Sequence, residues 1–194
     1  NGIPISVTAR IFYFNDATWA KSGLAYPTTW DELLNAGLVF KEKLGDQYYP
    51  VVLEHQDTLA LIRSYMTQKY NTPTIDEANK KFAYTPEQWV EFFTMYKKMV
   101  DNHVMPSTKY YASFGKSNMY EMKPWINGEW GGTYMWNSTI TKYSDNLTKP
   151  AKLILGPYPM LPEAKDAGLF FKPAQMLSIG KSTKYPKESA MLIN

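Results

Sequence analysis

The clearest pattern along the chain is an apolar stripe at helical spacing between Pro86 and His103. Apolar residues recur there every three or four positions, which places them on one face of a helix. Thr85 and Gln88 have the spacing of a capping box, and Pro86 stands at the first helical position. The pattern therefore predicts a helix over residues 86–103.

Weaker helical signals occur in the rest of the chain. Thr29 and Glu32 have capping-box spacing before a leucine-rich stretch, which predicts a helix from about residue 30 to Gly45. Apolar residues at helical spacing predict another helix over 58–70, after a polar turn at 54–57. Helices are also expected at 16–23, 119–127 and 137–143 and from residue 186 onward, with irregular structure at 74–84 and 107–117.

Runs rich in β-branched and aromatic residues predict five strands. The longest covers residues 3–15 (IPISVTARIFYFN), and the others are expected at 48–53, 133–135, 153–155 and 170–179. Strands that alternate with helices predict an α/β fold of three layers, with helices packed on both faces of a small mixed sheet. Because the strands are few and short, the fold should be helix-rich.

Both ends of the chain have the pattern of a cut rather than of a finished domain. The first strand follows no turn, and the last helix stops at Asn194, directly after the apolar residues 190–193 and without a C-cap glycine. We therefore expect residues 1–194 to form one lobe excised from a longer protein. An isolated lobe exposes surfaces that once met its partner, so a homodimer of the fragment is also expected.

The composition indicates an ordinary folded domain and argues against several classes of function. Hydrophobic residues make up 44% of the 194 residues, which is enough for a sizeable core. The net charge is +3 and the basic residues are scattered, which argues against a nucleic-acid partner and a membrane-surface helix. No apolar run reaches the roughly 18 residues of a membrane span. Without cysteine, the chain can form neither disulfides nor thiolate metal sites.

The sequence contains no motif for metal binding, nucleophilic catalysis or phosphate binding, so no metal, cofactor or catalytic residue is predicted. His103 lies at the end of the strong helix, where a cation suits the helix dipole. His55 lies in the expected polar turn and faces either a ligand or solvent. Glu54, Asp57 and Glu129 are candidates for paired glycosidase carboxylates by location only.

The most unusual segment covers residues 125–137 and contains three tryptophans, one tyrosine and three glycines. Glycines permit tight turns and a close approach of the backbone to a ligand. Aromatic rings can stack on the flat apolar faces of sugars, whose hydroxyl groups bind polar side chains. The segment therefore predicts a sugar-binding platform. The alternative is that these rings close the core around a strand-to-helix turn.

Three motifs carry a resemblance to a known family. The first is a strand ending in Phe14-Asn15-Asp16, followed by Tyr26-Pro27-Thr28-Thr29-Trp30-Asp31-Glu32-Leu33-Leu34. The second is residues 128–136 (GEWGGTYMW), and the third is residues 174–190 (AQMLSIGKSTKYPKESA). Together they resemble the family 1 extracellular solute-binding proteins, which include maltodextrin-binding protein. The chain departs from the family pattern at residues 130–132, where Ala-Ala-Met is usual, and at residues 173–174, where Gly-Gly is usual.

The resemblance implies a periplasmic-binding-protein-like type II fold, of which this chain is the C-terminal-type lobe. Residues 1–15 and 170–182 would be the hinge-crossing strands, and the first lobe of the same chain would be missing. The family binds solutes for ABC importers, so the implied partners are an oligosaccharide, held between the lobes, and ABC permease subunits. The implied location is extracellular, as a membrane-anchored lipoprotein of a Gram-positive cell or in a periplasm. The alternatives to a binding protein are a glycoside-acting enzyme and a non-transport interaction module on the same fold.

The position of each motif indicates which residues would face the ligand. Trp136 and Asn137 end the aromatic segment, and Gln56, Asp57 and His55 lie in the expected turn.

Arg10 lies mid-strand, on the same side as Phe12 and Phe14, and would reach a ligand hydroxyl or carboxylate, unless it forms a surface ion pair. Three further aromatic candidates, for which a core position is the alternative, are Tyr65, Trp130 and Tyr134. Because the chain supplies one wall of the site, the isolated lobe should bind sugar weakly or undetectably.

Overall fold

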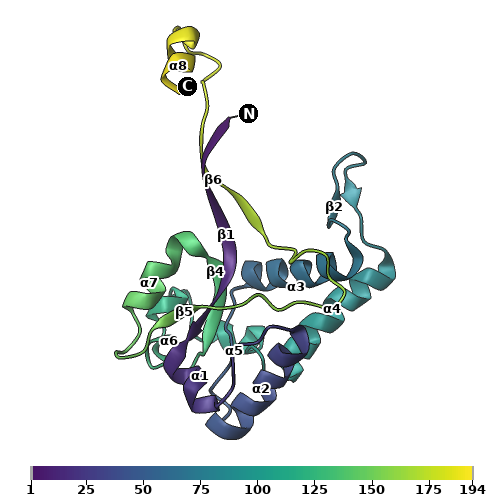
Figure 1. Ribbon diagram of the computed structural model, residues 1–194, viewed down its shortest axis with the longest axis vertical. Helices are drawn as coiled ribbons and strands as arrows, with labels where there is room; N and C mark the ends of the chain where they lie inside the picture. The colour runs from purple at the N-terminus through teal and green to yellow at the C-terminus, as the bar shows by residue number, and fades with distance from the viewer. Residues whose placement is uncertain (1, 194) are drawn as a thin grey trace.

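One long strand organises the structure. The computed structural model describes residues 2–193, and an arm rises from its body (Figure 1). Strand β1 (Ile3–Asn15) has the predicted bounds, and it runs from the arm into the body. Its first half pairs with β6 (Phe171–Leu177), and its second half with β4 (Gly132–Trp136) and β5 (Leu153–Leu155). These pairings are antiparallel; among the described residues, the parallel pairing expected of a mixed sheet is limited to two isolated bridges.

Helices pack around this sheet, as expected. They are α1 (Asp16–Ser22), α2 (Trp30–Leu44), α3 (His55–Tyr70), α4 (Pro86–Asp101), α5 (Thr108–Ala112), α6 (Lys123–Ile126), α7 (Ile140–Asp145) and α8 (Pro186–Ile193), with the 3-10 helices η1 (Met119–Glu121) and η2 (Asn137–Thr139). Both predicted capping boxes form: Thr29 accepts a bond from the Glu32 backbone, and Thr85 from the Gln88 backbone. Each box occupies backbone donors that would otherwise lack partners at a helix start.

Alternation of side chains along the sheet separates two apolar cores. Phe12 and Tyr134 lie in the larger core, which they share with residues of α2, α3 and α4. Met135, the next residue along β4, lies in the smaller core with Trp125 and Trp130. The fold therefore has helices on both faces of the sheet, which confirms the three-layer expectation.

Gly37 allows α2 to lie directly against the end of α4. A Cβ at this position would lie 2.1 Å from the carbonyl oxygen of Asn102 and 2.5 Å from the backbone nitrogen of Val104. Both atoms belong to the main chain, so neither can move as the end of a flexible side chain could. The contact requires a residue without a side chain.

The expectation of a strand at residues 48–53 was wrong. The segment is buried, but its amides bond to irregular backbone: Val51 N donates to Val104 O at 3.2 Å, and Val52 N to Gly132 O at 2.9 Å. Pro50 has no amide to donate, which interrupts any regular ladder.

The expected turn at residues 54–57 was also wrong, because α3 already begins at His55. Two further segments are more regular than predicted. Residues 75–82 form a hairpin of β2 (Ile75–Asp76) and β3 (Lys81–Phe82), and α5 lies within residues 107–117. These elements are only two to five residues long, which is too short for a periodic pattern to reveal.

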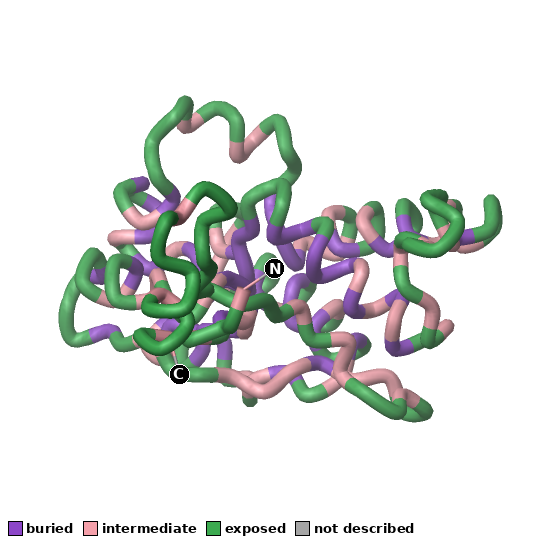
Figure 2. Tube along the Cα trace, turned by 90° about the horizontal axis from the view of Figure 1, so that it is seen from above, coloured by how far each residue is buried: buried purple, intermediate pink, exposed green. Residues whose placement is uncertain are grey.

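The arm consists of the first half of β1, strand β6 and helix α8. Its residues are mostly exposed, and so is the β2–β3 hairpin, whereas buried residues lie in the body (Figure 2). Several large apolar side chains of the arm are exposed, among them Phe171 at 65% and Leu192 at 89%. Among residues 2–193, no helix has both the length and the apolar character needed to cross a bilayer.

Candidate functional site

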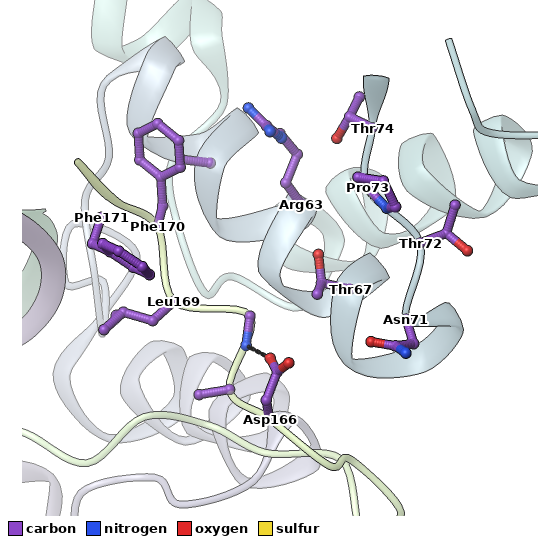
Figure 3. A pocket seen from close by; sticks show the side chains of 13 residues that line it. Arg63, Thr67, Asn71, Thr72, Pro73, Thr74, Asp166, Leu169, Phe170 and Phe171 are labelled. Carbon is purple, nitrogen blue, oxygen red and sulfur yellow. Dashed lines mark hydrogen bonds between the residues drawn. The ribbon is translucent and has the colours of Figure 1, made fainter. Parts of the chain in front are cut away.

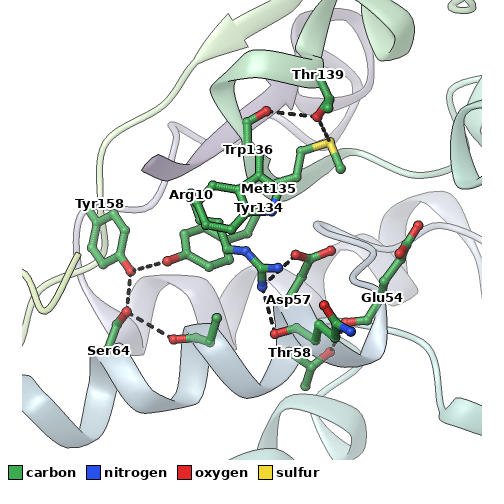
Figure 4. Close-up of polar contacts among 12 residues, drawn as sticks. Arg10, Glu54, Asp57, Thr58, Ser64, Tyr134, Met135, Trp136, Thr139 and Tyr158 are labelled. Atoms are coloured by element: carbon green, nitrogen blue, oxygen red, sulfur yellow. Dashed lines mark hydrogen bonds and ion pairs between the residues drawn. The ribbon is translucent and has the colours of Figure 1, made fainter. Parts of the chain in front are cut away.

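The residues predicted to bind ligand come together where the arm leaves the body. Arg10 of β1 lies directly opposite Trp136 of β4 in the sheet, so both side chains lie on the same face. The backbone amide of Arg10 donates to the carbonyl oxygen of Phe170 at 3.0 Å, which places Phe170 on the other flank of β1. The first turn of α3, with Asp57, lies over the same face of the sheet (Figure 4).

Arg10 and Asp57 form a buried ion pair. The Nη1 atom of Arg10 lies 2.7 Å from Oδ1 of Asp57, and it also donates to the carbonyl oxygen of Gln56 at 2.8 Å. The side chains are 7% and 6% exposed. The prediction that Arg10 shares a side with Phe12 and Phe14 is confirmed. The alternative had expected a surface ion pair, but the ion pair that Arg10 forms is buried. The pair fixes the guanidinium in one orientation.

Three cations surround two aromatic rings at this place. The Cζ atom of Arg10 lies 4.7 Å from the ring centroid of Trp136 and 5.7 Å from that of Phe170. Lys172 Nζ lies 4.9 Å from the Trp136 ring, and Arg63 Cζ lies 5.5 Å from the Phe170 ring. The two ring centroids are 5.6 Å apart, and both rings are partly exposed. The arrangement offers a flat apolar surface beside concentrated positive charge.

A hollow of about 290 Å³ opens beside Trp136. We call it the Trp136 hollow; its lining includes Arg10, Glu54, Gln56, Asp57, Tyr120 and Trp136. Lys142 also contributes, and its Nζ atom lies 6.0 Å from the ring centroid of Tyr120. Predicted residues from β1, α3 and β4 therefore meet in one concave site.

Two of the predicted aromatic residues do not reach this surface. Trp130 and Tyr134 are both 0% exposed, so neither offers a ring face to a ligand, and the prediction that they contact one was wrong. Their rings fill the two cores instead. Glycine-rich sequence around them provides the space: Gly131 lies so close to Phe40 and to Pro50 O that a Cβ would meet them at 2.8 and 3.1 Å.

Tyr134 nevertheless supports the site from below. Its hydroxyl lies 3.0 Å from that of Tyr158, which donates to Oγ of Ser64 at 2.7 Å. Burial raises the pKa of Tyr134 above its ordinary value, so its hydroxyl stays protonated and can serve this chain of hydrogen bonds. These hydrogen bonds connect β4 to α3 near Arg10 and Trp136 (Figure 4).

The other predicted residues take different positions. Asn137 is exposed, and its Oδ1 accepts bonds from Thr8 Oγ1 at 2.7 Å and Ala9 N at 3.2 Å, so it anchors the end of β4 to β1. His55 and Gln56 are exposed in the first turn of α3. Tyr65 lies against α4, where its hydroxyl donates to Glu91 at 2.8 Å, and it does not line the Trp136 hollow.

Phe170, Lys172 and Arg63 are the residues that the sequence did not single out. Phe170 and Lys172 lie in the predicted last strand, and nothing in the pattern indicates that this strand pairs with the Arg10 end of β1. Among residues 2–193, no cluster of three or more metal-ligating side chains is present. The arrangement is suited to holding a flat, polar and negatively charged molecule.

The Asp57 carboxyl should make the stability of the protein depend on pH. Burial raises the pKa of Asp57 to about 6, against the opposing effect of Arg10 and with a further contribution from Glu54. Between about pH 4 and pH 6 the folded protein keeps this proton, whereas the unfolded chain has released it. Wild-type protein should therefore lose about 3 kcal/mol of unfolding free energy relative to Asp57→Asn as the pH rises through this window.

Urea unfolding of both proteins between pH 4 and pH 7 measures this difference. Asp145→Asn removes an exposed carboxyl from α7 and is the matched control for the loss of one carboxyl. A difference between wild type and Asp57→Asn that is constant with pH would show that Asp57 does not hold its proton as described.

Comparison with known proteins places this chain in a family. The family model for bacterial extracellular solute-binding proteins matches residues 2–193. A search among curated proteins finds no match. The resemblance to this family and the expected type II single-lobe fold are both confirmed.

Several solved structures are similar to the chain. One is a periplasmic oligogalacturonide binding protein from Yersinia enterocolitica in complex with saturated digalacturonic acid. It is 93% identical in sequence with a TM-score of 0.91, and the match covers 100% of this chain and 48% of that protein's chain. A periplasmic solute binding protein from Pectobacterium atrosepticum is 50% identical, with a TM-score of 0.92 and coverage of 99% and 48%. A de novo designed cysteine esterase, which is an engineered protein, is 89% identical, with a TM-score of 0.96 and coverage of 100% and 48%.

The chain spans about half the length of these proteins. The match to the family model over residues 2–193 covers nearly all of it. Its helices, its sheet and the surface around Trp136 have the arrangement described above. The chain therefore belongs to the bacterial extracellular solute-binding protein family.

Proposed function

We propose that the protein containing this chain captures an oligosaccharide of uronic acid units and delivers it to an ABC importer, without chemical change to the sugar. The observation that carries the proposal is the cation-aromatic cluster of Trp136 and Phe170 with Arg10, Arg63 and Lys172. Partly exposed rings suit the apolar faces of sugar units, and cations suit their carboxylates.

The charge balance around the two rings supports an acidic sugar rather than a neutral one. Arg10 is already paired with Asp57, whereas Arg63 and Lys172 are not among the ion pairs of residues 2–193. Two cations near the rings are thus left to balance negative charge from a ligand. The digalacturonic acid bound to the Yersinia enterocolitica protein, which is 93% identical, supports the same class of ligand.

The proposed mechanism is closure of two lobes around the sugar. This chain supplies one wall, and the remainder of the longer protein supplies the other. The arm, which contains the proposed hinge strands at residues 1–15 and 170–182, packs against that remainder and directs the closure. The sugar favours the closed form because only that form contacts it from both sides. An isolated copy of the chain would bind sugar weakly and self-associate through the exposed arm.

The proposed location is outside the cytoplasm, where the closed protein meets the permease subunits of the importer. Its periplasmic relatives support this placement. Anchoring to a membrane as a lipoprotein is a further part of the proposal. The enzyme alternative has less support, because the esterase among its relatives was designed rather than natural.

Calorimetric titration of the full-length protein tests the proposed function. We expect saturable binding of trigalacturonic acid that is roughly 100-fold tighter than binding of a neutral galactose trimer, since each charge-assisted bond is worth a factor of about ten. Equal affinity for the two sugars would contradict the acidic specificity. Release of new reducing ends from the acidic trimer would contradict the binding-protein role.

A further inference from the structure

A second pocket lies beside the first, over the C-terminal half of α3. Its volume is about 620 Å³. We call it the Arg63 pocket; its lining includes Arg63, Thr67, Asn71, Thr74, Phe170 and Phe171. Arg63 rises from α3 with Phe170 on one side and Thr74 on the other (Figure 3).

The two concavities have no lining residue in common, but they meet at a pair of neighbouring aromatic rings. Phe170 lines the Arg63 pocket, and its ring lies 5.6 Å from that of Trp136, which lines the Trp136 hollow. The two arginines also flank this ring, with Arg10 Cζ at 5.7 Å and Arg63 Cζ at 5.5 Å from its centroid. A molecule on Trp136 therefore lies next to the Arg63 pocket.

The floor of both concavities is one face of α3. Gln56 lines the Trp136 hollow, and Ala60, Arg63 and Thr67 line the Arg63 pocket. These residues are three or four positions apart, which places them in a row along the helix. A linear ligand lying along this row would pass from the one concavity into the other.

The state of the two arginines differs. Arg10 is held by Asp57 and by the Gln56 carbonyl oxygen. Within residues 2–193, the guanidinium of Arg63 has neither an ion-pair partner nor a hydrogen bond, and the residue is partly exposed. Asp166, the carboxylate that lines the Arg63 pocket, accepts a bond from the Gly168 amide at 2.6 Å in its own loop. Arg63 is thus available to an anionic group from outside the chain.

The rest of the pocket is suited to a sugar rather than to a small inorganic anion. Phe170 and Phe171 offer apolar rings, and Thr67 and Asn71 offer a hydroxyl and an amide to sugar hydroxyls. The volume is about twice that of the Trp136 hollow, which leaves room for more than a single charged group.

We infer that the Arg63 pocket is a second sugar subsite, in which Arg63 binds the carboxylate of the uronic acid unit next to the one on Trp136. The inference rests on the proposed function, since it assigns a further part of the same ligand. Under this inference, Arg63 makes the affinity depend on the number of uronic acid units in the ligand. One unit occupies the Trp136 hollow, and a second unit makes the contacts of the Arg63 pocket.

Titration of the full-length protein with galacturonic acid and with its dimer and trimer tests the inference. The wild-type protein should bind the dimer or trimer at least tenfold more tightly than the single unit. Arg63→Gln should remove most of this gain, so that its affinities for the dimer and for the single unit become nearly equal. Arg63→Lys keeps the charge but not the planar fork, so it should retain part of the gain. Lys97→Gln removes an exposed charge from α4 and should behave as wild type.

The outcomes separate this inference from the proposed function. Wild-type protein that binds no uronic acid of any length would overturn both. If the affinity of the wild-type protein rises with the number of sugar units and that of Arg63→Gln rises equally, the second subsite alone is overturned. Equal weakening of a neutral galactose dimer by Arg63→Gln would also overturn it, because the residue would then not act on the carboxylate. Circular dichroism melting of each variant confirms that the protein is folded.

Discussion

Trp136→Ala should weaken binding of the acidic oligosaccharide by roughly 100-fold or more. Of the four rings between residues 125 and 137, only that of Trp136 is not fully buried. Its loss removes the stacking surface for a sugar unit and also removes the ring against which the Arg10 and Lys172 cations lie. Lys172 would then be hydrated and free to move, which lowers its value to a ligand carboxylate, whereas Arg10 would lose its ring contact but stay held by Asp57.

Calorimetric titration of the full-length protein measures this loss. Trp136→Phe keeps a flat ring at the same place and is the matched control, for which binding should fall by about tenfold or less. Because Trp136 is only partly buried, the alanine variant should remain folded at room temperature. Unchanged binding by Trp136→Ala would remove this ring from the site and with it the main support for the proposed function.

Gly37→Ala should destabilise the protein by about 3 kcal/mol or more, although alanine is the better helix former. In an exposed helix this change would stabilise by up to about 1 kcal/mol. Here the added Cβ would lie 2.1 Å from the carbonyl oxygen of Asn102 and 2.5 Å from the nitrogen of Val104. Helices α2 and α4 would have to separate, which disturbs the larger core between them.

Urea unfolding at constant pH checks the sign of this effect. Asn35→Ala on the exposed face of the same helix gains helix propensity without a new contact, so it should stabilise slightly. The two substitutions should therefore change the free energy of unfolding in opposite directions, although both place alanine in α2. Stabilisation by Gly37→Ala would mean that α2 and α4 do not lie as close as the structure places them.

Local signals made the main elements predictable. The capping residues Thr29 and Thr85 mark true helix starts, and the β-branched run at residues 3–15 marks β1. Both signals depend on neighbours within about four positions, so the sequence contains them in full. The start of α3 carried no such signal, because Glu54 at its N-cap makes no side-chain cap, and the turn expected at residues 54–57 was wrong for that reason.

The site was predictable only in part. Arg10, Asp57 and Trp136 follow from strand alternation and from the order of the motifs, and the structure brings them together. Which rings of the aromatic segment are buried depends on close contacts of Gly131 with Phe40 and Pro50, which are distant in sequence. Phe170 and Arg63 join the site because Phe170 accepts a bond from the Arg10 amide and the first turn of α3 contacts the Arg10 side chain. Such long-range placement leaves no trace in a local pattern.

The pairing of β1 with β6 is uneven along its length. The register shifts between Pro4 and Ser6 and again between Ser6 and Val7, and regular pairing resumes toward Arg10. An irregular ladder has fewer bonds to resist bending, whereas the bonds of Asn137 to Thr8 and Ala9 stiffen the strand just beyond it. In the proposed closure of the lobes, bending of the arm is thus concentrated a few residues from the proposed sugar site. Under that proposal the site keeps its geometry while the arm bends, so its ligand contacts need not form anew at each opening.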